Sequence, residues 1–141
     1  MDPPSYLLDE SFLIALADAD DSHHDDAKAM YRRLIDDFVA QRCLLVARAD
    51  HLAAVGSREL FAAVDKLHVA RQHRNAAEKM VKASGMEMDL AITLVLIHRY
   101  KLRKVAGFDQ RLAGYQIELI TPGDLVDPVV APLDENESVK S

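Results

Sequence analysis

The chain has 141 residues, half of them hydrophobic, which is enough to bury one sizeable core but leaves little room for a second domain. Its formal net charge of −6 argues against nucleic-acid binding through overall charge, because phosphate binding draws on Lys and Arg. The single cysteine, Cys43, excludes an internal disulfide framework and is expected to be a small buried thiol.

The first third of the chain alternates short apolar runs with helical patterns. A buried strand is predicted at residues 6–8, and Ser11 is expected to be the N-cap of a helix at 12–17. Apolar residues with a 3.6-residue period predict a second helix at 27–38. A second buried strand is predicted at 43–47, so the pattern here is strand, helix, helix, strand.

The middle of the chain is mostly helical in pattern. The spacing at 50–67 predicts a helix that is kinked or split at Gly56. A short third strand is considered at 68–70, and a further helix is predicted at 75–83. This stretch therefore adds at most one strand to the sheet.

The last third contains a helix at 85–100 that is apolar nearly all round and should be buried. Residues 84–87 fit a capping box that opens this helix. Strands are predicted at 104–108 and 117–121, with a short helix at 110–113 between them. Strands that alternate with helices and are continuously apolar indicate a parallel sheet covered on both faces.

The two ends of the chain differ in composition from this core. Residues 1–123 are expected to form the single domain, and 124–141 an acidic tail with prolines that is mobile from about residue 127. The N-terminus lacks the basic patch and apolar stretch of a signal peptide, and the longest apolar run, 90–97, is too short to span a bilayer. We therefore expect a cytoplasmic protein that does not enter a membrane.

Three aspartates stand where an open parallel sheet would hold a metal ion. Asp9 and Asp109 each follow a predicted strand, and Asp89 lies near the start of the buried helix. Because the carboxyl ends of parallel strands share one edge, these carboxylates are expected to converge on one crevice. Crowded carboxylates repel one another, and a hard divalent cation offsets that repulsion. Each residue also has a structural explanation, since Asp9 and Asp109 could cap the following helices and Asp89 suits a helix N-terminus.

Positive charge is concentrated in one part of the chain. Residues 71–104 hold eight bases and three acids, whereas residues 1–40 hold three bases and ten acids. Two explanations remain open for these bases, namely solvated helix faces and a surface that binds RNA. The candidates for RNA binding are Arg71, Arg74, Arg99, Lys101, Arg103 and Lys104.

Five short motifs follow one another along residues 5–122. They are Leu7-Leu8-Asp9-Glu10-Ser11, His24-Asp25-Asp26-Ala27, Met88-Asp89-Leu90-Ala91, the run at 104–109 and the run at 117–122. In this order they resemble the PIN-domain nucleases of the VapC toxin type, which share the Asp-x-Ser opening and the His-x-x-Ala of the second helix. The order of the motifs, more than any one of them, carries the resemblance.

The resemblance implies a fold, an activity and partners. The implied fold is a PIN-like three-layer α/β/α sandwich with a central parallel sheet of four to five strands. Asp9, Asp89 and Asp109 would be the catalytic ligands of Mg²⁺ or Mn²⁺, with Glu10 or Ser11 in support. The implied protein is an endoribonuclease toxin that hydrolyses RNA phosphodiester bonds, pairs with a small antitoxin protein and forms a homodimer.

The chain departs from the family pattern at two positions. The family's metal-site Glu falls on Ala54, which cannot ligate a cation, so Asp50 or Glu59 could compensate only with a different local backbone. Gly107 replaces the usual Thr or Ser before the last Asp. These departures favour an alternative, a degenerate PIN-like domain without nuclease activity that binds RNA or protein.

Other kinds of site lack their usual residues. The six histidines, His51 among them, show no zinc-type pairing on one helix face, and one cysteine offers no thiolate cluster. No glycine-rich phosphate loop and no Gly-x-Ser-x-Gly elbow occur. A phosphoacceptor aspartate is disfavoured because Asp9-Glu10-Ser11 is not the Asp-x-Asp of phosphotransferases.

Overall fold

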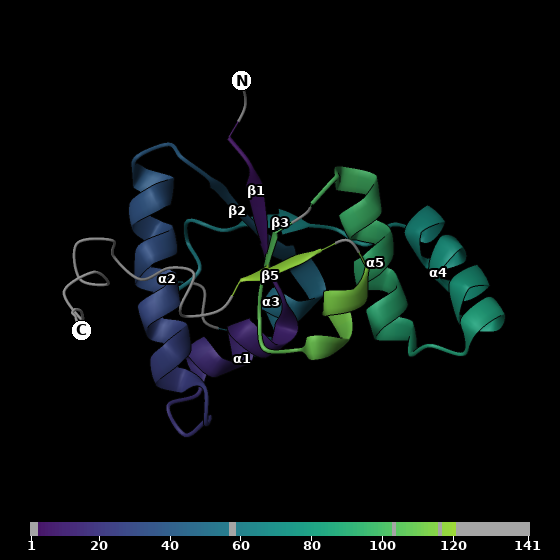
Figure 1. The fold of residues 1–141 in the computed structure, drawn as a ribbon, viewed down its shortest axis with the longest axis horizontal. Helices are drawn as coiled ribbons and strands as arrows, with labels where there is room; N and C mark the ends of the chain where they lie inside the picture. The colour runs from purple at the N-terminus through teal and green to yellow at the C-terminus, as the bar shows by residue number, and fades with distance from the viewer. Residues whose placement is uncertain (1–2, 57–58, 103, 116, 121–141) are drawn as a thin grey trace, which may run out of the picture.

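The computed structural model describes residues 3–56, 59–102, 104–115 and 117–120, and in these ranges it shows strands alternating with helices (Figure 1). In chain order the elements are β1 (Ser5–Leu8), α1 (Glu10–Ala17), α2 (His24–Val39), β2 (Leu44–Arg48), α3 (Ala49–Val55), β3 (Asp65–Leu67), α4 (Arg71–Ser84), α5 (Met88–Tyr100), β4 (Lys104–Ala106), the 3-10 helix η1 (Gln110–Gly114) and β5 (Glu118–Ile120). Across the described ranges, every helix is too short or too polar to cross a bilayer. The predicted tail at 124–141, with the domain boundary before it, lies outside the described residues.

The strands form one parallel sheet in the order β3-β2-β1-β4-β5. β1 is the central strand, and its Leu7 pairs with Val46 of β2 on one side and Val105 of β4 on the other. The chain first adds β2 and β3 to one side of β1 and later adds β4 and β5 to the other side. Such a change of direction opens a crevice beyond the carboxyl ends of the strands, which is where ligands of these sheets bind.

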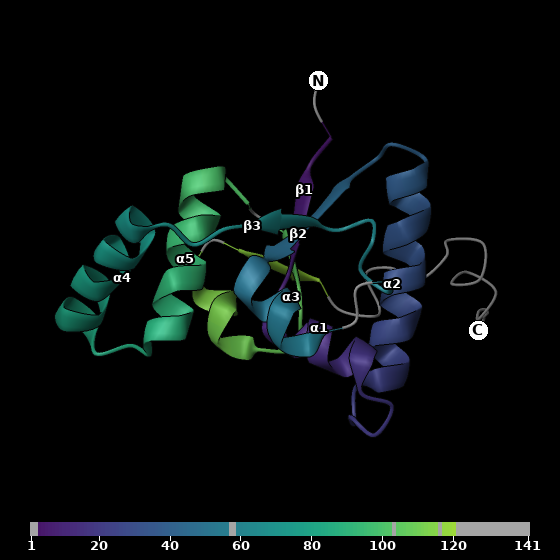
Figure 2. The ribbon, with the colours of Figure 1, turned by 180° about the vertical axis from the view of Figure 1, so that it is seen from behind.

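Helices cover both faces of the sheet, as the sequence predicts. Figures 1 and 2 show α1 and α2 on one side of the sheet and α4 and α5 on the other. Successive residues of β1 point to opposite faces, so Leu8 packs in the core with Phe12 of α1, whereas Leu7 packs with Leu94 of α5. The result is the three-layer α/β/α arrangement with a parallel sheet, here of five strands.

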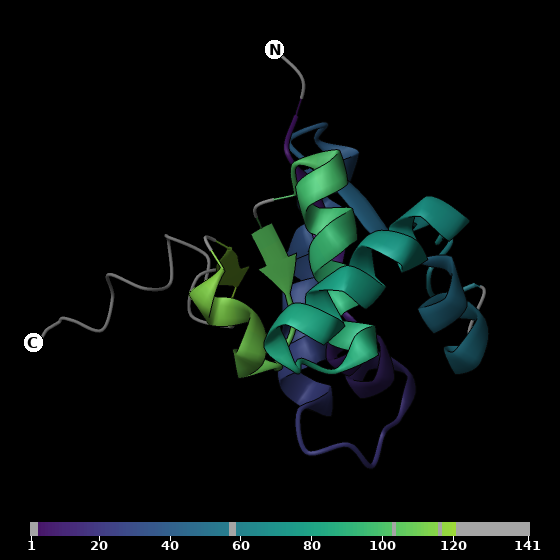
Figure 3. The same cartoon turned by 90° about the vertical axis from the view of Figure 1, so that its right-hand side faces the viewer.

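The outer helix α4 is attached mainly through α5. Ala77 of α4 is fully buried against Ala91, Ile92 and Leu96 of α5. Figure 3 shows α4 crossing the outer side of α5, away from the sheet. This contact explains why α5 is apolar nearly all round, because one side faces the sheet and the other faces α4.

The segment after β2 departs most from the prediction. α3 ends at Val55, because Gly56 takes the left-handed conformation (φ 77°) and its N–H donates to the Leu52 carbonyl. Phe61 and Val64 still enter the core, but from a segment that is not an α-helix, so the prediction of a helix through residue 67 is wrong. The third strand is Asp65–Leu67 and not 68–70, because it must pair with Val46 through Arg48 of β2.

Two predicted helix caps are also wrong. α1 begins at Glu10, so Asp9 and not Ser11 is its N-cap, with Asp9 Oδ1 accepting from the Phe12 N–H at 2.9 Å. The capping box at 84–87 does not form, because Gly85 (φ 76°) ends α4 and the Ser84 hydroxyl donates to the Met80 carbonyl at 2.7 Å. α5 therefore begins at Met88, after the end of α4 and a short connection.

Candidate metal centre at the carboxyl edge of the sheet

A cavity of about 250 Å³ lies at the carboxyl edge of the sheet, where the starts of α1 and α5 meet α3 and η1. Asp9, Asp89 and Asp109 all line this cavity, so the structure brings the three predicted aspartates to one place. The other lining residues are Glu10, Ser11, Ile14, His51, Leu90, Thr93, Arg111 and Leu112.

Asp9 is held rigidly and is almost completely buried, with 6% of its surface exposed. Its N–H donates to the Ala106 carbonyl of β4, and its Oδ1 accepts from the Ser11 hydroxyl at 2.6 Å and from the Phe12 N–H. Its Oδ2 is buried and has no hydrogen-bond partner among the described residues. Burial raises the pKa of Asp9 to about 6, the negative charge of Asp109 adds to the rise, and the two hydrogen bonds oppose it. Among the described residues, no Lys or Arg side chain forms an ion pair with Asp9.

The Asp9 carboxylate occupies the space that a side chain at residue 107 would fill, so its position requires Gly107. A Cβ atom at residue 107 would lie 2.1 Å from Asp9 Oδ2 and 2.2 Å from Asp9 Oδ1, far inside contact distance. The Thr or Ser of the family pattern therefore cannot stand at this position while Asp9 has this conformation. The departure at Gly107 is a requirement of this packing and does not show that the site is lost.

Asp89 is fixed by a buried arginine that sequence reasoning missed. Arg48, at the end of β2, is 2% exposed and lies 3.0 Å from Asp89 Oδ1, while also donating to the Asp89 carbonyl and the Thr93 hydroxyl, each at 3.0 Å. His51 Nε2 donates to the same carboxylate oxygen at 3.2 Å. The sequence signal that could have found Arg48 is its place as a charged residue at the end of an otherwise apolar strand.

Asp109 is paired with Arg111 at the rim of the cavity. The Arg111 guanidinium reaches both carboxylate oxygens, with Nε 3.0 Å from Oδ1 and Nη2 2.7 Å from Oδ2. Asp109 also caps η1, since its Oδ1 accepts from the Arg111 N–H at 3.0 Å. The hydrogen bonds from Arg111 hold the pKa of Asp109 below its ordinary value, although partial burial opposes this.

The tightest group of possible metal ligands in the described part of the chain is Glu10, His51 and Asp89, whose ligand atoms lie within 4.8 Å of one another. Of the three predicted aspartates, only Asp89 belongs to this group, while Asp9 and Asp109 line the same cavity outside it. His51 was missed because its pairing is with α5 and not with a second residue of its own helix. Sequence reasoning looked for a ligand at Ala54, but Ala54 is exposed and His51, three residues earlier on α3, lines the cavity.

Two of the supporting candidates have other roles. Asp50 does not line the cavity and is bound by Arg48, with 2.6 Å between Arg48 Nη2 and Asp50 Oδ2. Its partial burial is outweighed by this arginine, so the pKa of Asp50 is lowered. Ser11 lines the cavity and links two elements, because its hydroxyl donates to Asp9 and accepts from the Phe108 N–H at 2.8 Å.

The donor set suits a hard or borderline divalent cation. Carboxylate oxygens from Asp9, Glu10, Asp89 and Asp109 and one imidazole from His51 surround a single small cavity. The buried Asp9 Oδ2, unpartnered among the described residues, is the kind of atom that a cation would satisfy. The residues present therefore fit Mg²⁺ or Mn²⁺.

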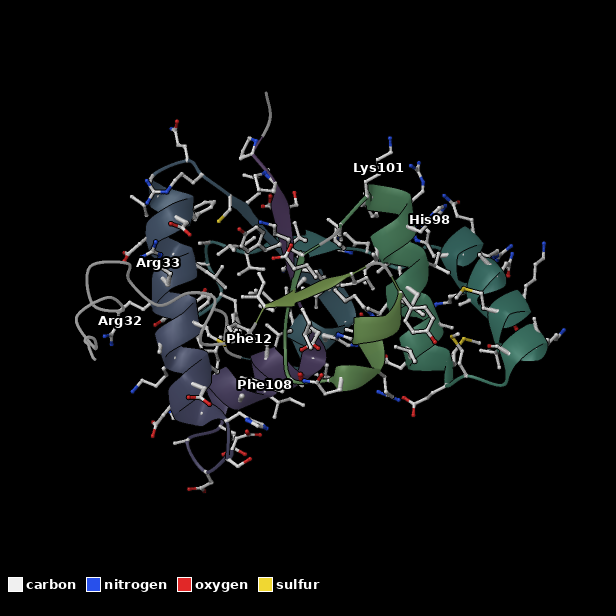
Figure 4. All side chains as sticks on the ribbon, viewed as in Figure 1. Phe12, Arg32, Arg33, His98, Lys101 and Phe108 are labelled. Carbon is white, nitrogen blue, oxygen red and sulfur yellow. The ribbon has the colours of Figure 1, made fainter. Side chains whose placement is uncertain are left out.

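None of the predicted basic residues in the described ranges lines this cavity. Arg99 follows Asp89 by ten residues in α5, about 15 Å along the helix axis. Figure 4 shows His98 and Lys101 at the upper end of α5, whereas Phe12 and Phe108 lie lower in the view, near α1. Arg99 and Lys101 border a separate hollow, and Arg71 and Arg74 border another. Lys104 begins β4 with its ammonium 5.3 Å from the centre of the Tyr6 ring, and Arg103 is outside the described residues.

Comparison with known proteins supports the fold. A scan against protein-family models and a search of curated proteins find no match. Among solved structures, the chain is similar to VapC20 of Mycobacterium tuberculosis, described as a toxin that cleaves the sarcin-ricin loop. The identity is 17% and the TM-score 0.57, and the match covers 79% of this chain and 98% of that chain. The chain therefore has a VapC-like PIN fold, as the motif order predicts.

Proposed function

We propose that this protein is a Mg²⁺- or Mn²⁺-dependent endoribonuclease of the VapC toxin type, which hydrolyses phosphodiester bonds of RNA. The observation that carries the proposal is the convergence of Asp9, Asp89 and Asp109 on one cavity, with a buried Asp9 oxygen that has no partner in the described part of the chain. The similarity to VapC20 adds that this fold supports RNA cleavage in another protein.

The side chains that line the cavity would have different roles in this reaction. Asp9, Asp89 and Asp109 would offer oxygens to the cation. Glu10 and His51 lie close enough to Asp89 that they would complete the ligand set of the cation or orient a water molecule. A cation held there would supply Lewis-acid activation of water and would neutralise charge on the phosphate. Arg48 and Ser11 keep Asp89 and Asp9 in position by hydrogen bonds made inside the protein.

The direct test is the variant Asp9→Asn. Asparagine is as good an N-cap as aspartate, so α1 should be retained while the charge is lost. We expect Mn²⁺-dependent cleavage of single-stranded or structured RNA to fall at least 100-fold, roughly the loss of several kcal/mol of transition-state stabilisation. The matched control is Asp20→Asn, an exposed residue before α2 that makes the same charge change away from the cavity. Undiminished cleavage by Asp9→Asn would refute the proposal.

The proposed partners follow from the resemblance and extend the proposal. They are RNA, a small antitoxin protein that blocks the acidic cavity, and a second copy of the chain in a homodimer, all in the cytoplasm. A short neighbouring reading frame that encodes a DNA-binding antitoxin would support the toxin assignment. Sedimentation of the purified protein tests the dimer.

A second candidate is a degenerate PIN-like domain that binds RNA or protein without cleaving it. The observation that favours it is that Arg48 and Arg111 already neutralise Asp89 and Asp109, while Ala54 offers no ligand. Calorimetric titration with Mn²⁺ separates the two candidates. Uptake that is lost in Asp9→Asn supports the nuclease, and absence of uptake in both proteins supports the binding module.

A further inference from the structure

The contact between Asp109 and Arg111 engages both oxygens of the carboxylate. Arg111 Nε lies 3.0 Å from Oδ1 and 3.2 Å from Oδ2, and Nη2 lies 2.7 Å from Oδ2. A guanidinium bound in this bidentate way makes two charge-assisted hydrogen bonds and repels a second positive charge. While this pair is closed, Asp109 is a poor ligand for a metal ion.

The two arginines near the cavity differ in their freedom to move. Arg48 is buried, with its side chain 3% exposed, and is held by Asp50, Asp89 and Thr93 together. Arg111 has a side chain that is 51% exposed and sits on the short helix η1. Arg111 can therefore turn away through solvent, whereas moving Arg48 would leave a buried charge without partners.

A second acceptor for Arg111 is already in place. Its Nη1 lies 3.5 Å from Oε2 of Glu87, an exposed residue at the N-cap of α5 and two residues before Asp89. The contact with Glu87 is longer than the contacts with Asp109, so the arginine favours Asp109 in this conformation. Arg111 thus binds the Asp109 carboxylate closely and has the Glu87 carboxylate within reach as a second partner.

We propose that Arg111 is a gate for the metal site, which binds Asp109 until a divalent cation competes for that carboxylate and then moves to Glu87 at the rim. This inference rests on the proposed function and adds to it a form of regulation by the chain itself. The gate keeps the cavity closed to a cation at low concentration, because opening it breaks the bidentate pair. After opening, the guanidinium would stay beside Glu87, which is outside the set of residues that line the cavity.

The test is calorimetric titration of the full chain with Mn²⁺, comparing wild type with Arg111→Gln and Arg111→Lys. We expect Arg111→Gln to bind Mn²⁺ about tenfold more tightly, since one bidentate charge-assisted pair no longer has to be broken. Arg111→Lys keeps the charge but loses the planar fork, so its affinity should lie between those of wild type and Arg111→Gln. The matched control is Arg32→Gln, an exposed arginine of α2 (Figure 4), which makes the same charge change and should shift affinity less than twofold.

The outcomes separate the gate from the proposed function. Equal Mn²⁺ affinity in wild type and Arg111→Gln overturns the gate, and Asp9-dependent RNA cleavage in the same preparations would leave the nuclease proposal standing. Absence of Mn²⁺ uptake in every variant overturns both. A parallel gain in Arg111→Gln and Arg32→Gln assigns the effect to net charge and also overturns the gate. Circular dichroism of the variants checks that these exposed substitutions leave the fold intact.

Discussion

An aspartate follows the carboxyl end of β1 and another follows that of β4, and their pKa values are shifted in opposite directions. Asp9 and Asp109 both follow a strand and both cap the next helix, accepting from the backbone N–H of Phe12 and Arg111 respectively. Asp9 is buried and has a pKa raised to about 6, whereas Asp109 is partly exposed, paired with Arg111, and has a lowered pKa. The local rule that places an aspartate before a helix is the same at both sites. Burial at Asp9 and the neighbouring Arg111 at Asp109 then shift the two pKa values in opposite directions.

The largest expected effect is a pH dependence of stability that comes from Asp9. Because the pKa of Asp9 is raised on folding, Asp9 adds to the free energy of unfolding. This stabilisation is fully present below the ordinary aspartate pKa of 3.8 and is lost as the pH rises through about 6. The free energy of unfolding without metal should fall by roughly 2 to 3 kcal/mol between pH 4 and pH 8. Asp109, with its lowered pKa, acts in the opposite direction and loses its contribution only in acid.

Urea denaturation in EDTA, with wild type and Asp9→Asn in parallel, measures this difference. The variant should show a much flatter dependence on pH over that window, and saturating Mn²⁺ should flatten the wild-type curve by stabilising the ionised carboxylate. Parallel curves for wild type and Asp9→Asn in EDTA would contradict the contrast between the two strand ends.

The next effect is a loss of stability in Gly107→Ala. The new Cβ would overlap the Asp9 carboxylate and force it from its cap, at a cost of about 2 kcal/mol for the lost cap and hydrogen bonds. Gly85→Ala is the comparison, because open space surrounds residue 85 and only its positive φ of 76° costs about 1 kcal/mol. Chemical denaturation checks both values, and an unchanged Mn²⁺ affinity in Gly107→Ala would show that Asp9 does not contact the ion.

A smaller effect is expected from Ser11→Ala, which removes the link between the ends of β1 and β4. The Ser11 hydroxyl donates to Asp9 and accepts from the Phe108 N–H, so its loss should cost about 1 kcal/mol. The pKa of Asp9 should rise further, because the hydrogen bond from Ser11 lowers it. Thermal denaturation measures the cost, with the exposed Ser22→Ala expected to change little.

The smallest effect on stability is expected from Asp109→Asn. Its partner Arg111 is about half exposed, so water replaces much of the lost interaction and the free energy of unfolding should change by less than about 0.5 kcal/mol. A loss of several kcal/mol would show that the pair at the end of β4 supports the fold, as Asp9 does at the end of β1. Asp109→Asn should nevertheless weaken Mn²⁺ binding if Asp109 is a ligand.

Much of the fold could be predicted because its signals are local. The apolar runs near residues 6–8 and 43–47 give β1 and β2, and the 3.6-residue period gives α2. The convergence of Asp9, Asp89 and Asp109 also followed from one topological rule, that parallel strands end at a common edge. The end of α3 was not predictable from spacing, since Phe61 and Val64 reach the core without a helix.

The charge partners of the site were the part that the sequence did not reveal. Arg48 meets Asp89 across 41 residues of chain, and His51 meets it across 38, so only the packing of α3 beside α5 brings them together. The pair of Asp109 and Arg111 is local, because the partners are two positions apart in the chain, and that spacing could have been found from the sequence. Among these charge pairs, the local one could be inferred from the sequence, whereas the two pairs that join distant segments needed coordinates.

The sheet order has a consequence for synthesis on the ribosome. β1 is made first, but one of its two neighbours is β4, which follows it by about a hundred residues together with Asp109 and Arg111. A nascent chain that stops before β4 holds Asp9, His51 and Asp89 yet has an open flank on its central strand. If the protein is a toxin, a translating ribosome would thus carry it in a harmless state until the last part of the domain has emerged.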